Sequence, residues 1–373
     1  MTKKQLNSYK LKKKLNLIFF LPNFSAGGAG KSILKICENI NYFEYSIYII
    51  SLGKNYYKKQ FKNLDSFVIE LENKPLLNSL INILEIVNKI NKKNKLKTCL
   101  ISNINYSNVI LPLFFNKYIK VILIERTPLY ELDFYNGILD YIKKKIIKSM
   151  INFSYSKSYQ IIANSNYIKK ELSNILEKKI ITIHPNILIT KHKKIYKKKL
   201  NLLWVGRISR EKNFYDMIKS LDYLENIDFM LTIISNEKIN LDEFNLSQNS
   251  QKKIKFKIFS NNIEDEFKKA HIFISTSIYE GFPNVVAEAV NYECLIIASK
   301  SQGGIRDIIK SSKFGFFYRL YDHKDLAKKI AYVISNYKKL KQMTAYSKKK
   351  LSILAKNNNT KYKDLFINIS KTI

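Results

Sequence analysis

Short apolar runs alternate along this chain with longer amphipathic segments. The first half contains five runs that predict buried strands, at residues 15–21, 45–52, 98–103, 120–126 and 159–165. Segments with helical periodicity lie between them, for example at residues 31–40 and 76–93. Strands that alternate with helices in this way predict a parallel sheet with both faces covered.

The second half repeats the same pattern. We expect strands at residues 200–207, 228–235, 253–260, 271–277 and 294–300, and helices at 213–224, 284–293, 304–312 and 324–340. The two series are separated by the charged stretch KHKKIYKKK. We therefore predict an α/β protein with two Rossmann-like domains that face a central cleft, at residues 1–190 and 200–350, joined by a basic linker at 191–199.

Composition and charge limit the possible classes of function but do not identify one. The chain has 373 residues, which is enough for two domains, and 46% of them are hydrophobic. With 65 Lys and Arg against 30 Asp and Glu, the net charge of +35 would attract nucleic acid, anionic lipid or anionic small molecules. AT-rich coding also produces many lysines, so both explanations of the charge stay open.

Cysteine and histidine give no sign of a metal or disulfide framework. The three cysteines and four histidines are scattered along the chain, which predicts no metal site and a reducing cytosol. The apolar run at residues 17–21 is shorter than the roughly 7–15 residues of a signal-peptide core, and no run reaches the roughly 18 of a spanning helix. We expect a cytoplasmic protein, either soluble or bound to the inner face of the membrane.

The stretch FSAGGAGKS at residues 24–32 suggests a phosphate-binding loop. A P-loop requires Gly-x-x-x-x-Gly-Lys-Ser/Thr, and the position of its first glycine holds Ser25. What remains is a strand, a turn with Gly27 and Gly28, and a helix expected to start near Lys31. Amides at a helix N-terminus favour an anion, so a phosphate site is predicted here, with tight strand–helix packing as the alternative.

A sharper pattern lies in the second domain. Arg207 lies at the end of a strand and Lys212 just before a helix, so the two cations can close on one diphosphate. Further on, Glu280 precedes a helix that starts at Asn284, and Glu288 lies inside that helix. A carboxylate on each side of the helix amides suits a nucleotide sugar, which carries ribose hydroxyls, a diphosphate and sugar hydroxyls.

These residues resemble those of a known family. The chain is similar to retaining GT-B glycosyltransferases of family 4, the "glycosyl transferases group 1" type. The similarity rests on Gly206-Arg207, Lys212, Glu280-Gly281-Phe282-Pro283-Asn284 with Glu288, Gly303-Gly304-Ile305 and Gly315. It is strong over residues 200–320 and looser over 1–199, where the Gly27-Gly28 loop occupies the place of the family's donor-phosphate loop.

The resemblance implies roles for these residues. Glu280 would contact the hydroxyls of the donor sugar, and Arg207 and Lys212 would hold the leaving diphosphate, which makes these three the catalytic candidates. The residues expected to bind the nucleotide sugar are Gly27, Gly28, Gly281, Phe282, Pro283, Asn284, Val285 and Glu288. No cofactor or metal is expected, because fixed cations and helix amides can offset the charge of the leaving group.

Three further segments carry weaker predictions. Glu125-Arg126 ends a strand in the first domain, and these residues are either acceptor-site groups or a surface ion pair. Residues 137–155 form a basic amphipathic pattern, which suits an anionic membrane surface or an ordinary buried helix face with solvated lysines. The segment 351–373 is expected to cross back to the first domain, as it does in the family.

The sequence therefore predicts a glycosyltransferase. It would transfer a hexose or N-acetylhexosamine unit from a nucleotide sugar, UDP-linked, to a glycan or lipid-linked acceptor for surface polysaccharide. A P-loop kinase or NTPase is one alternative, and a basic nucleic-acid-binding protein is another. The latter needs exposed aromatics among its basic residues, but most of the tyrosines lie in apolar runs, so no nucleic-acid partner is expected.

Overall fold

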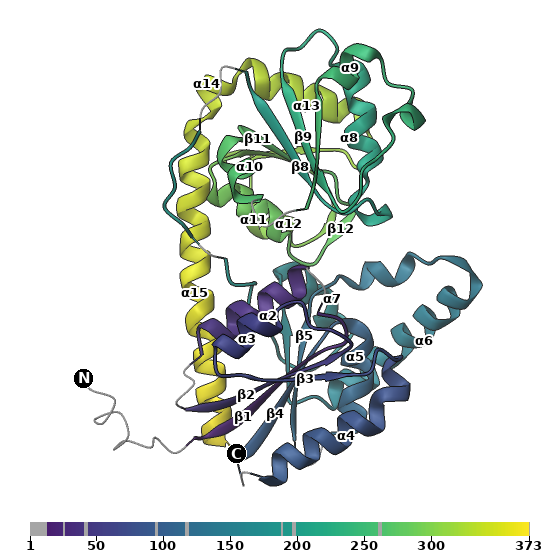
Figure 1. Ribbon diagram of the computed structural model, residues 1–373, viewed down its shortest axis with the longest axis vertical. Helices are drawn as coiled ribbons and strands as arrows, with labels where there is room; N and C mark the ends of the chain where they lie inside the picture. Colours follow the sequence, from purple (N-terminus) through teal and green to yellow (C-terminus); the bar gives the residue numbers. More distant parts are fainter. Residues whose placement is uncertain are drawn as a thin grey trace. The chain divides into compact units, whose positions relative to one another are not determined.

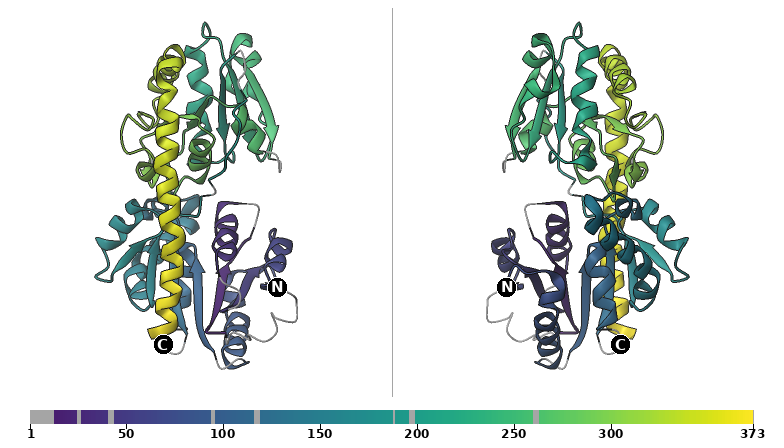
Figure 2. Two further views of the ribbon diagram at one scale, coloured as in Figure 1. Left: turned by 90° about the vertical axis from the view of Figure 1, so that its left-hand side faces the viewer. Right: turned by 90° about the vertical axis from the view of Figure 1, so that its right-hand side faces the viewer.

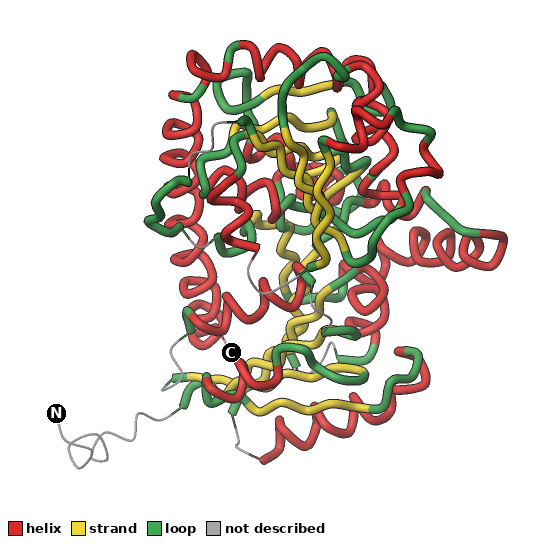
Figure 3. Tube along the Cα trace, turned by 45° about the horizontal axis from the view of Figure 1, so that its top comes forward, coloured by secondary structure: helices red, strands yellow, loops and turns green. Residues whose placement is uncertain are grey.

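The computed structural model divides the chain into two compact units. It describes residues 13–24, 27–40, 44–93, 96–115, 119–187, 189–195, 199–259 and 263–372. Unit 1 comprises Met1–Asn186 together with Asn357–Ile373, and unit 2 comprises Ile187–Lys356. Each unit is a parallel sheet covered by helices (Figures 1 and 3).

Unit 1 contains a seven-stranded parallel sheet in the order β3-β2-β1-β4-β5-β6-β7. Its strands are β1 (Leu15–Leu21), β2 (Tyr45–Leu52), β3 (Phe67–Leu71), β4 (Lys97–Asn103), β5 (Lys120–Glu125), β6 (Gln160–Ala163) and β7 (Ile180–Thr182). The sequence pattern predicted five of these strands and missed the two edge strands. β3 has no fully buried residue and β7 has only three residues, so neither forms a long apolar run.

Alternate residues of the unit 1 strands feed two cores. In β1, Leu15, Leu17, Phe19 and Leu21 pack on one face of the sheet, against α2 (Gly28–Glu38), α3 (Lys58–Asn63) and the end of α15 (Gln342–Thr372). The alternate residues of β1 face α4 (Leu76–Lys93), α5 (Asn105–Ile110), α6 (Gly137–Ser156) and α7 (Asn166–Ser173). Helices therefore bury both faces of the sheet, which explains the continuous apolar runs of the central strands.

Unit 2 contains a six-stranded parallel sheet in the order β10-β9-β8-β11-β13-β15. Its strands are β8 (Asn201–Val205), β9 (Met230–Ser235), β10 (Ile254–Ile258), β11 (Ile272–Ser275), β13 (Leu295–Ser299) and β15 (Phe316–Tyr318). A separate two-stranded ladder joins β12 (Tyr279–Glu280) to β14 (Gln302–Gly303). The sequence pattern missed β12, β14 and β15, which have only two or three residues each.

The helices of unit 2 also form two layers. One face of the sheet packs on α8 (Phe214–Ser220) and α13 (His323–Ser335), and the other on α10 (Ile263–Lys269), α11 (Asn284–Asn291) and α12 (Ile305–Ile308). Shorter elements complete the unit: η3 (Arg210–Lys212), η4 (Leu221–Tyr223), η5 (Leu241–Phe244), α9 (Gln248–Lys252) and α14 (Tyr337–Leu340). In unit 1 the short elements are η1 (Leu111–Leu113) and η2 (Leu129–Asp133).

One continuous helix, α15, contributes to the cores of both units (Figure 2). Leu351 packs in unit 2, whereas Tyr362, Phe366 and Ile369 pack in unit 1. The described part of the stretch predicted as a linker is held by unit 2, because Lys194 Nζ donates to the carbonyl oxygen of Tyr292 at 2.7 Å. Residues 196–198 of that stretch lie outside the described residues.

No helix in the described part of the chain combines the length and the hydrophobicity needed to span a lipid bilayer.

Candidate functional site

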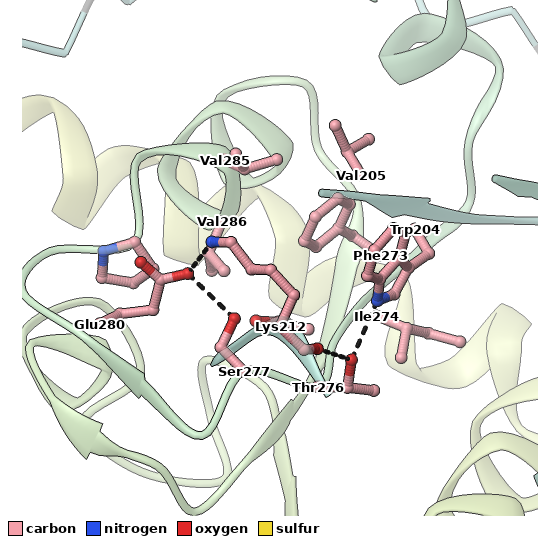
Figure 4. Close-up of a pocket in the computed structure, with 12 residues that line it drawn as sticks. Trp204, Val205, Lys212, Phe273, Ile274, Thr276, Ser277, Glu280, Val285 and Val286 are labelled. Carbon is pink, nitrogen blue, oxygen red and sulfur yellow. Dashed lines mark hydrogen bonds and ion pairs between the residues drawn. The ribbon is translucent and has the colours of Figure 1, made fainter. Parts of the chain in front are cut away.

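The loop after β8 carries the two predicted diphosphate cations in different surroundings. Arg207 is 68% exposed, and its Nη2 donates to Glu211 Oε1 at 2.9 Å. Lys212 is only 19% exposed, and its Nζ contacts Glu280 Oε1. Figure 4 shows the lysine and the glutamate pointing toward one another. The structure therefore brings Lys212 and Glu280 together and leaves Arg207 in the exposed part of the same loop.

Glu280 is fixed by the β12–β14 ladder. Its backbone carbonyl accepts from Gly304 N at 2.9 Å, and its Oε1 accepts from Ser277 Oγ at 2.9 Å. Gly303 has φ +123°, and a Cβ built there would lie 1.7 Å from the backbone oxygen of Glu280. Only glycine permits this conformation and this approach, so Gly303 sets the position of the Glu280 loop.

A chain of two hydrogen bonds, which starts at a buried tryptophan, fixes the backbone of Lys212. Trp204 Nε1 donates to Thr276 Oγ1 at 2.9 Å, and Thr276 Oγ1 donates to the backbone oxygen of Lys212 at 2.7 Å. Sequence reasoning missed Trp204, Thr276 and Ser277 as site residues. The polar run Ser275-Thr276-Ser277 at the carboxyl end of an apolar strand was the available signal, because ligands bind at such ends in parallel sheets.

These groups line a small hollow in unit 2 (Figure 4). Its polar lining includes Lys212 and Glu280. Pro283, the N-cap of α11, and Val285 and Val286 in the first turn of that helix also line it. Asn284 N donates to the carbonyl oxygen of Phe282 at 2.9 Å, whereas the next two amides of the first turn have no acceptor within their own helix. The first turn of α11 has no acidic side chain. The dipole and the amides of α11 therefore favour an anion beside Lys212.

The remaining predicted residues of this loop lie around the hollow. Gly281 is buried, and the Phe282 side chain is packed in the core of unit 2, so either could meet a ligand only through its backbone. Asn284 is the half-buried first residue of α11. Glu288 is half-buried on the next turn and is not among the residues that line the hollow.

The two other predicted nucleotide-binding residues, Gly27 and Gly28, lie in unit 1, where both are exposed. The predicted helix start near Lys31 was wrong by three residues, because α2 begins at Gly28 with an extended Gly27 as its N-cap. Gly30 has a packing reason, since a Cβ there would lie 2.7 Å from Tyr57 Cε2. Residues 25 and 26 lie outside the described residues, so the comparison with a P-loop at Ser25 rests on sequence.

Glu125 and Arg126 are not a surface ion pair, which was one of the two alternatives. Glu125 is fully buried, and its Oε2 accepts from Tyr155 Oη at 2.5 Å and from Asn108 Nδ2 at 3.2 Å. Burial raises the pKa of the Glu125 carboxyl, against the opposing effect of these hydrogen bonds. The Arg126 guanidinium contacts Asn103 and Ser32 instead.

The described residues contain no group of three His, Cys, Asp or Glu side chains placed to hold a metal ion. All three cysteines are buried. Burial raises the pKa of the Cys294 thiol, so this side chain is poorly suited to act as a nucleophile or a ligand.

The second unit belongs to a defined sequence family. Residues 186–350 match the family described as "Glycosyl transferases group 1". The capsular polysaccharide biosynthesis glycosyltransferase CapH of Staphylococcus aureus is 29% identical over 184 residues, which are 46% of this chain and 51% of CapH. A Campylobacter jejuni 4-alpha-N-acetylgalactosaminyltransferase is 27% identical over 116 residues, 31% of this chain and 32% of that enzyme. The matches thus span about half or less of these relatives.

Solved structures resemble the chain over almost its whole length. A glycosyltransferase from Rickettsia africae has a TM-score of 0.73 at 18% identity and covers 94% of this chain and 98% of its own. Anabaena HepE in complex with UDP has a TM-score of 0.73 at 13% identity, with coverage of 96% and 100%. The chain therefore has the GT-B fold of glycosyltransferases, with two Rossmann-like units, as the sequence predicted. Residues 186–350 are a domain of the glycosyl transferases group 1 family.

Proposed function

We propose that this protein is a retaining glycosyltransferase. It transfers a hexose or N-acetylhexosamine unit from a UDP-linked sugar to a glycan or lipid-linked acceptor in surface polysaccharide biosynthesis. The contact of Lys212 with Glu280 beside the first turn of α11 carries the proposal. A cation and helix amides suit the diphosphate of a sugar nucleotide, and a carboxylate suits the paired hydroxyls of its sugar.

Each group has a separate task in this proposal. Lys212, Arg207 and the first amides of α11 stabilise the charge that develops on the leaving diphosphate. Glu280 accepts hydrogen bonds from the donor sugar, and Glu288 accepts them from the ribose. Charge stabilisation by fixed groups of this kind removes several kcal/mol from a barrier, about 3–4 kcal/mol for one donor. No divalent ion is required in this scheme.

Proteins with similar sequences or folds support the choice of donor and acceptor. HepE was solved with UDP and with UDP-glucose. CapH is named for capsular polysaccharide biosynthesis, and the Campylobacter enzyme is named for a diphospho-undecaprenol acceptor. These names favour a UDP-sugar and a lipid-linked or polysaccharide acceptor for the present chain.

The thermal stability of the purified protein with UDP, GDP, ADP or ATP, each with and without magnesium, tests the proposal. A ligand at 100 times its Kd adds about 2.7 kcal/mol to the free energy of unfolding. We expect this gain with UDP in EDTA, its loss in Glu288→Ala and Arg207→Ala, and its retention in the control Arg319→Ala. Stabilisation by Mg-ATP alone, lost in Lys31→Ala, would establish the P-loop alternative instead.

The stereochemistry has its own readout. With the UDP-sugar identified, proton NMR of the product gives the anomeric configuration of the transferred sugar. A retained configuration supports the mechanism proposed here, and an inverted one refutes it while leaving the UDP site intact.

We further propose that α6 rests on an anionic membrane. Its first turns extend away from the body of unit 1 in Figure 1, and their apolar side chains are exposed: Ile138 (71%), Leu139 (81%), Ile142 (48%) and Ile146 (54%). The spacing of four residues from Ile138 to Ile142 to Ile146 places these side chains on one face. The buried Ile147 and Ile151 form a different face, so the exposed stripe is not the one that packs on the sheet.

The charges beside this stripe favour a lipid surface as its occupant. Lys143 and Lys145 are exposed and lie over tyrosine rings, whereas Lys148 is paired with Asp133. Apolar side chains between cations suit the boundary between acyl chains and anionic headgroups. We expect the protein to cosediment with phosphatidylglycerol vesicles but not with phosphatidylcholine vesicles.

A matched pair of variants tests this contact. Leu139→Asp should abolish cosedimentation, whereas Ile81→Asp should not. Ile81 on α4 is also exposed (68%), and the sequence positions one turn before and after it hold no lysine. Equal binding by both variants, or no binding by the unaltered protein, would refute the membrane contact and leave the proposed transferase activity unaffected.

A further inference from the structure

Arg126 differs from the other basic residues of this chain. The 65 Lys and Arg include only five arginines: Arg126, Arg207, Arg210, Arg306 and Arg319. Arg126 is the one arginine in the sequence of unit 1. Position 126 thus has a guanidinium in a sequence that uses lysine almost everywhere. The planar guanidinium of arginine can hold several acceptors at fixed angles, which lysine cannot.

Neutral oxygens hold this guanidinium in place. Its Nε and Nη2 both donate to Asn103 Oδ1, at 3.0 and 2.9 Å, and its Nη1 donates to Ser32 Oγ at 3.0 Å. Asn103 is fixed in turn, because its Nδ2 donates to the carbonyl oxygen of Phe20 at 3.1 Å. Contacts to the described residues use three of the five guanidinium N–H groups, which leaves one on each Nη for a further acceptor.

The positive charge of Arg126 has no carboxylate in contact with it among the residues that the structure describes. By contrast, Arg207 and Arg319 pair with Glu211 and Asp322 at the surface. Arg126 is partly buried, and burial lowers the pKa of its guanidinium, against the opposing fields of Tyr362 and Glu125. A partly buried cation held only by neutral groups is costly unless an anion completes its surroundings.

The position of Arg126 in the fold is that of a ligand site. Asn103 ends β4, Arg126 follows the last residue of β5, and Ser32 lies on the helix that follows β1. These three strands are neighbours in the sheet, so the three side chains meet at its carboxyl edge, where parallel α/β sheets bind ligands.

The backbone at this edge is strained. Ile104 has φ +81°, which is rare for a β-branched residue, and it lies between Asn103 and Asn105. Asn105 Oδ1 accepts from Thr127 Oγ1 at 2.5 Å, so both flanking asparagines are tied to the loop that carries Arg126. Strain of this kind persists where the surrounding structure fixes it, and it is concentrated at functional sites.

We propose that Arg126 binds an oxyanion, a phosphate or carboxylate group, at the carboxyl edge of the unit 1 sheet. The identification of this oxyanion as part of the acceptor rests on the proposed function, which places the donor diphosphate in unit 2. The free N–H groups on Nη1 and Nη2 contact the oxyanion, and Asn103 and Ser32 hold the fork in position. The acceptor is accordingly an acidic glycan or a phosphate-bearing carrier rather than a neutral sugar.

Arginine-selective ¹⁵N labelling of the full-length protein tests this site directly. The spectrum contains at most five Nε signals, and Arg126→Lys identifies the one from Arg126. Titration of the unaltered protein with inorganic phosphate, and separately with acetate, should move that signal along a saturable curve. The stronger of the two responses shows whether phosphate or carboxylate is preferred. The titration uses the unaltered protein, and if Arg126→Lys does not fold, lysine variants of the other four arginines assign the Arg126 signal by elimination.

A thermal-shift series gives an independent readout. Phosphate should raise the Tm of the unaltered protein and of the control Arg319→Lys more than that of Arg126→Lys. Any phosphate bound in unit 2 contributes equally to all three, so the difference isolates Arg126. An Arg126 signal that moves with neither anion overturns the proposal.

Addition of UDP separates this proposal from the proposed function. If UDP moves the Arg126 signal and the small anions do not, the group belongs to the donor site and the acceptor assignment is wrong. If UDP binds without moving the Arg126 signal and phosphate moves it, both proposals stand. If UDP does not bind but phosphate still moves the signal, the oxyanion site stands and the proposed donor does not.

Discussion

Lys212 and Glu280, which are 68 residues apart in the sequence, form an ion pair at the edge of the hollow in unit 2. Both side chains are about one-fifth exposed, at 19% and 21%. The pair holds the lysine at the N-terminus of α11 before any ligand binds. In the proposed function, the donor diphosphate replaces the carboxylate as the partner of Lys212, which frees Glu280 to accept hydroxyls of the sugar.

Lys212→Ala should lower sugar transfer about 10²–10³-fold, because it removes one fixed group that stabilises the leaving charge. The cost in stability should be about 1 kcal/mol or less, since the pair is partly exposed. Lys219→Ala is the control, because Lys219 is exposed to a similar degree (24%) and pairs with Asp222 on α8 and η4, outside the hollow. Initial rates with a UDP-sugar, together with Tm values, measure both effects. Activity of Lys212→Ala within tenfold of the unaltered protein would contradict the role given to this lysine.

Gly303→Ala should disrupt the position of Glu280. The new Cβ would lie 1.7 Å from the backbone oxygen of Glu280, so the β12–β14 ladder must shift. Gly137→Ala is the matched control, because Gly137 also has positive φ (+82°) but has no atom within 4 Å of its added Cβ. We expect the control to lose about 1 kcal/mol and Gly303→Ala to lose more, together with UDP binding. Equal Tm losses in the two variants would show that only backbone strain matters at Gly303.

Trp204 should report ligand binding by its fluorescence. It is the only tryptophan in the chain, it is 2% exposed, and it lines the hollow below Lys212. Its Nε1 bonds to Thr276, which bonds to the backbone of Lys212, so a ligand that displaces Lys212 alters the surroundings of the indole. UDP should change the emission intensity along a saturable curve, and the change should be smaller in Lys212→Ala. A UDP complex demonstrated by calorimetry without any change in emission would place the nucleotide elsewhere.

Glu266 should make the stability of the protein depend on pH. Burial tends to raise its carboxyl pKa, but hydrogen bonds from Lys257 at 2.6 Å and Lys269 at 3.1 Å outweigh this and lower it. A carboxylate with a lowered pKa stabilises the folded state above the pKa of the unfolded chain, about 4.3, and the gain disappears as the pH falls through the folded value. Glu266→Gln should therefore cost about 1 kcal/mol at pH 7 and progressively less below pH ~4. Urea unfolding at both pH values measures the difference, and a constant loss would exclude the ionised pair as its source.

Hydrophobic patterning predicted the central strands because they are buried on both sides. β1, β2 and β8 consist entirely of buried residues, and each forms an apolar run in the sequence. The edge strand β3 and the short strand β12 carry no such signal, since β3 is partly exposed and β12 is held by one neighbouring strand. β3 forms by pairing with β2 at the edge of the unit 1 sheet, and β12 forms by pairing with β14 in a separate ladder.

The site was predictable in its residue types but not in its pairing. A spacing motif indicated Arg207, Lys212 and Glu280, but it could not show that Lys212 contacts Glu280 while Arg207 pairs with Glu211. The direction of each side chain depends on the η3 turn and on the approach of Gly303 to Glu280. Thr276 and Ser277 were missed because a single hydroxyl has no distinctive spacing in a sequence.

The sequence by itself determined the order of strands and helices, the two-domain organisation and the group 1 motif, because these depend on periodicity and on residues close together in the chain. The tertiary structure decided which charged groups meet and which apolar residues stay exposed. Arg126 meets Ser32, 94 residues away, only because β1, β4 and β5 are neighbours in the sheet. On α6, Ile142 and Ile151 are equally apolar, yet only Ile151 is buried, because the sheet covers one face of that helix and not the other.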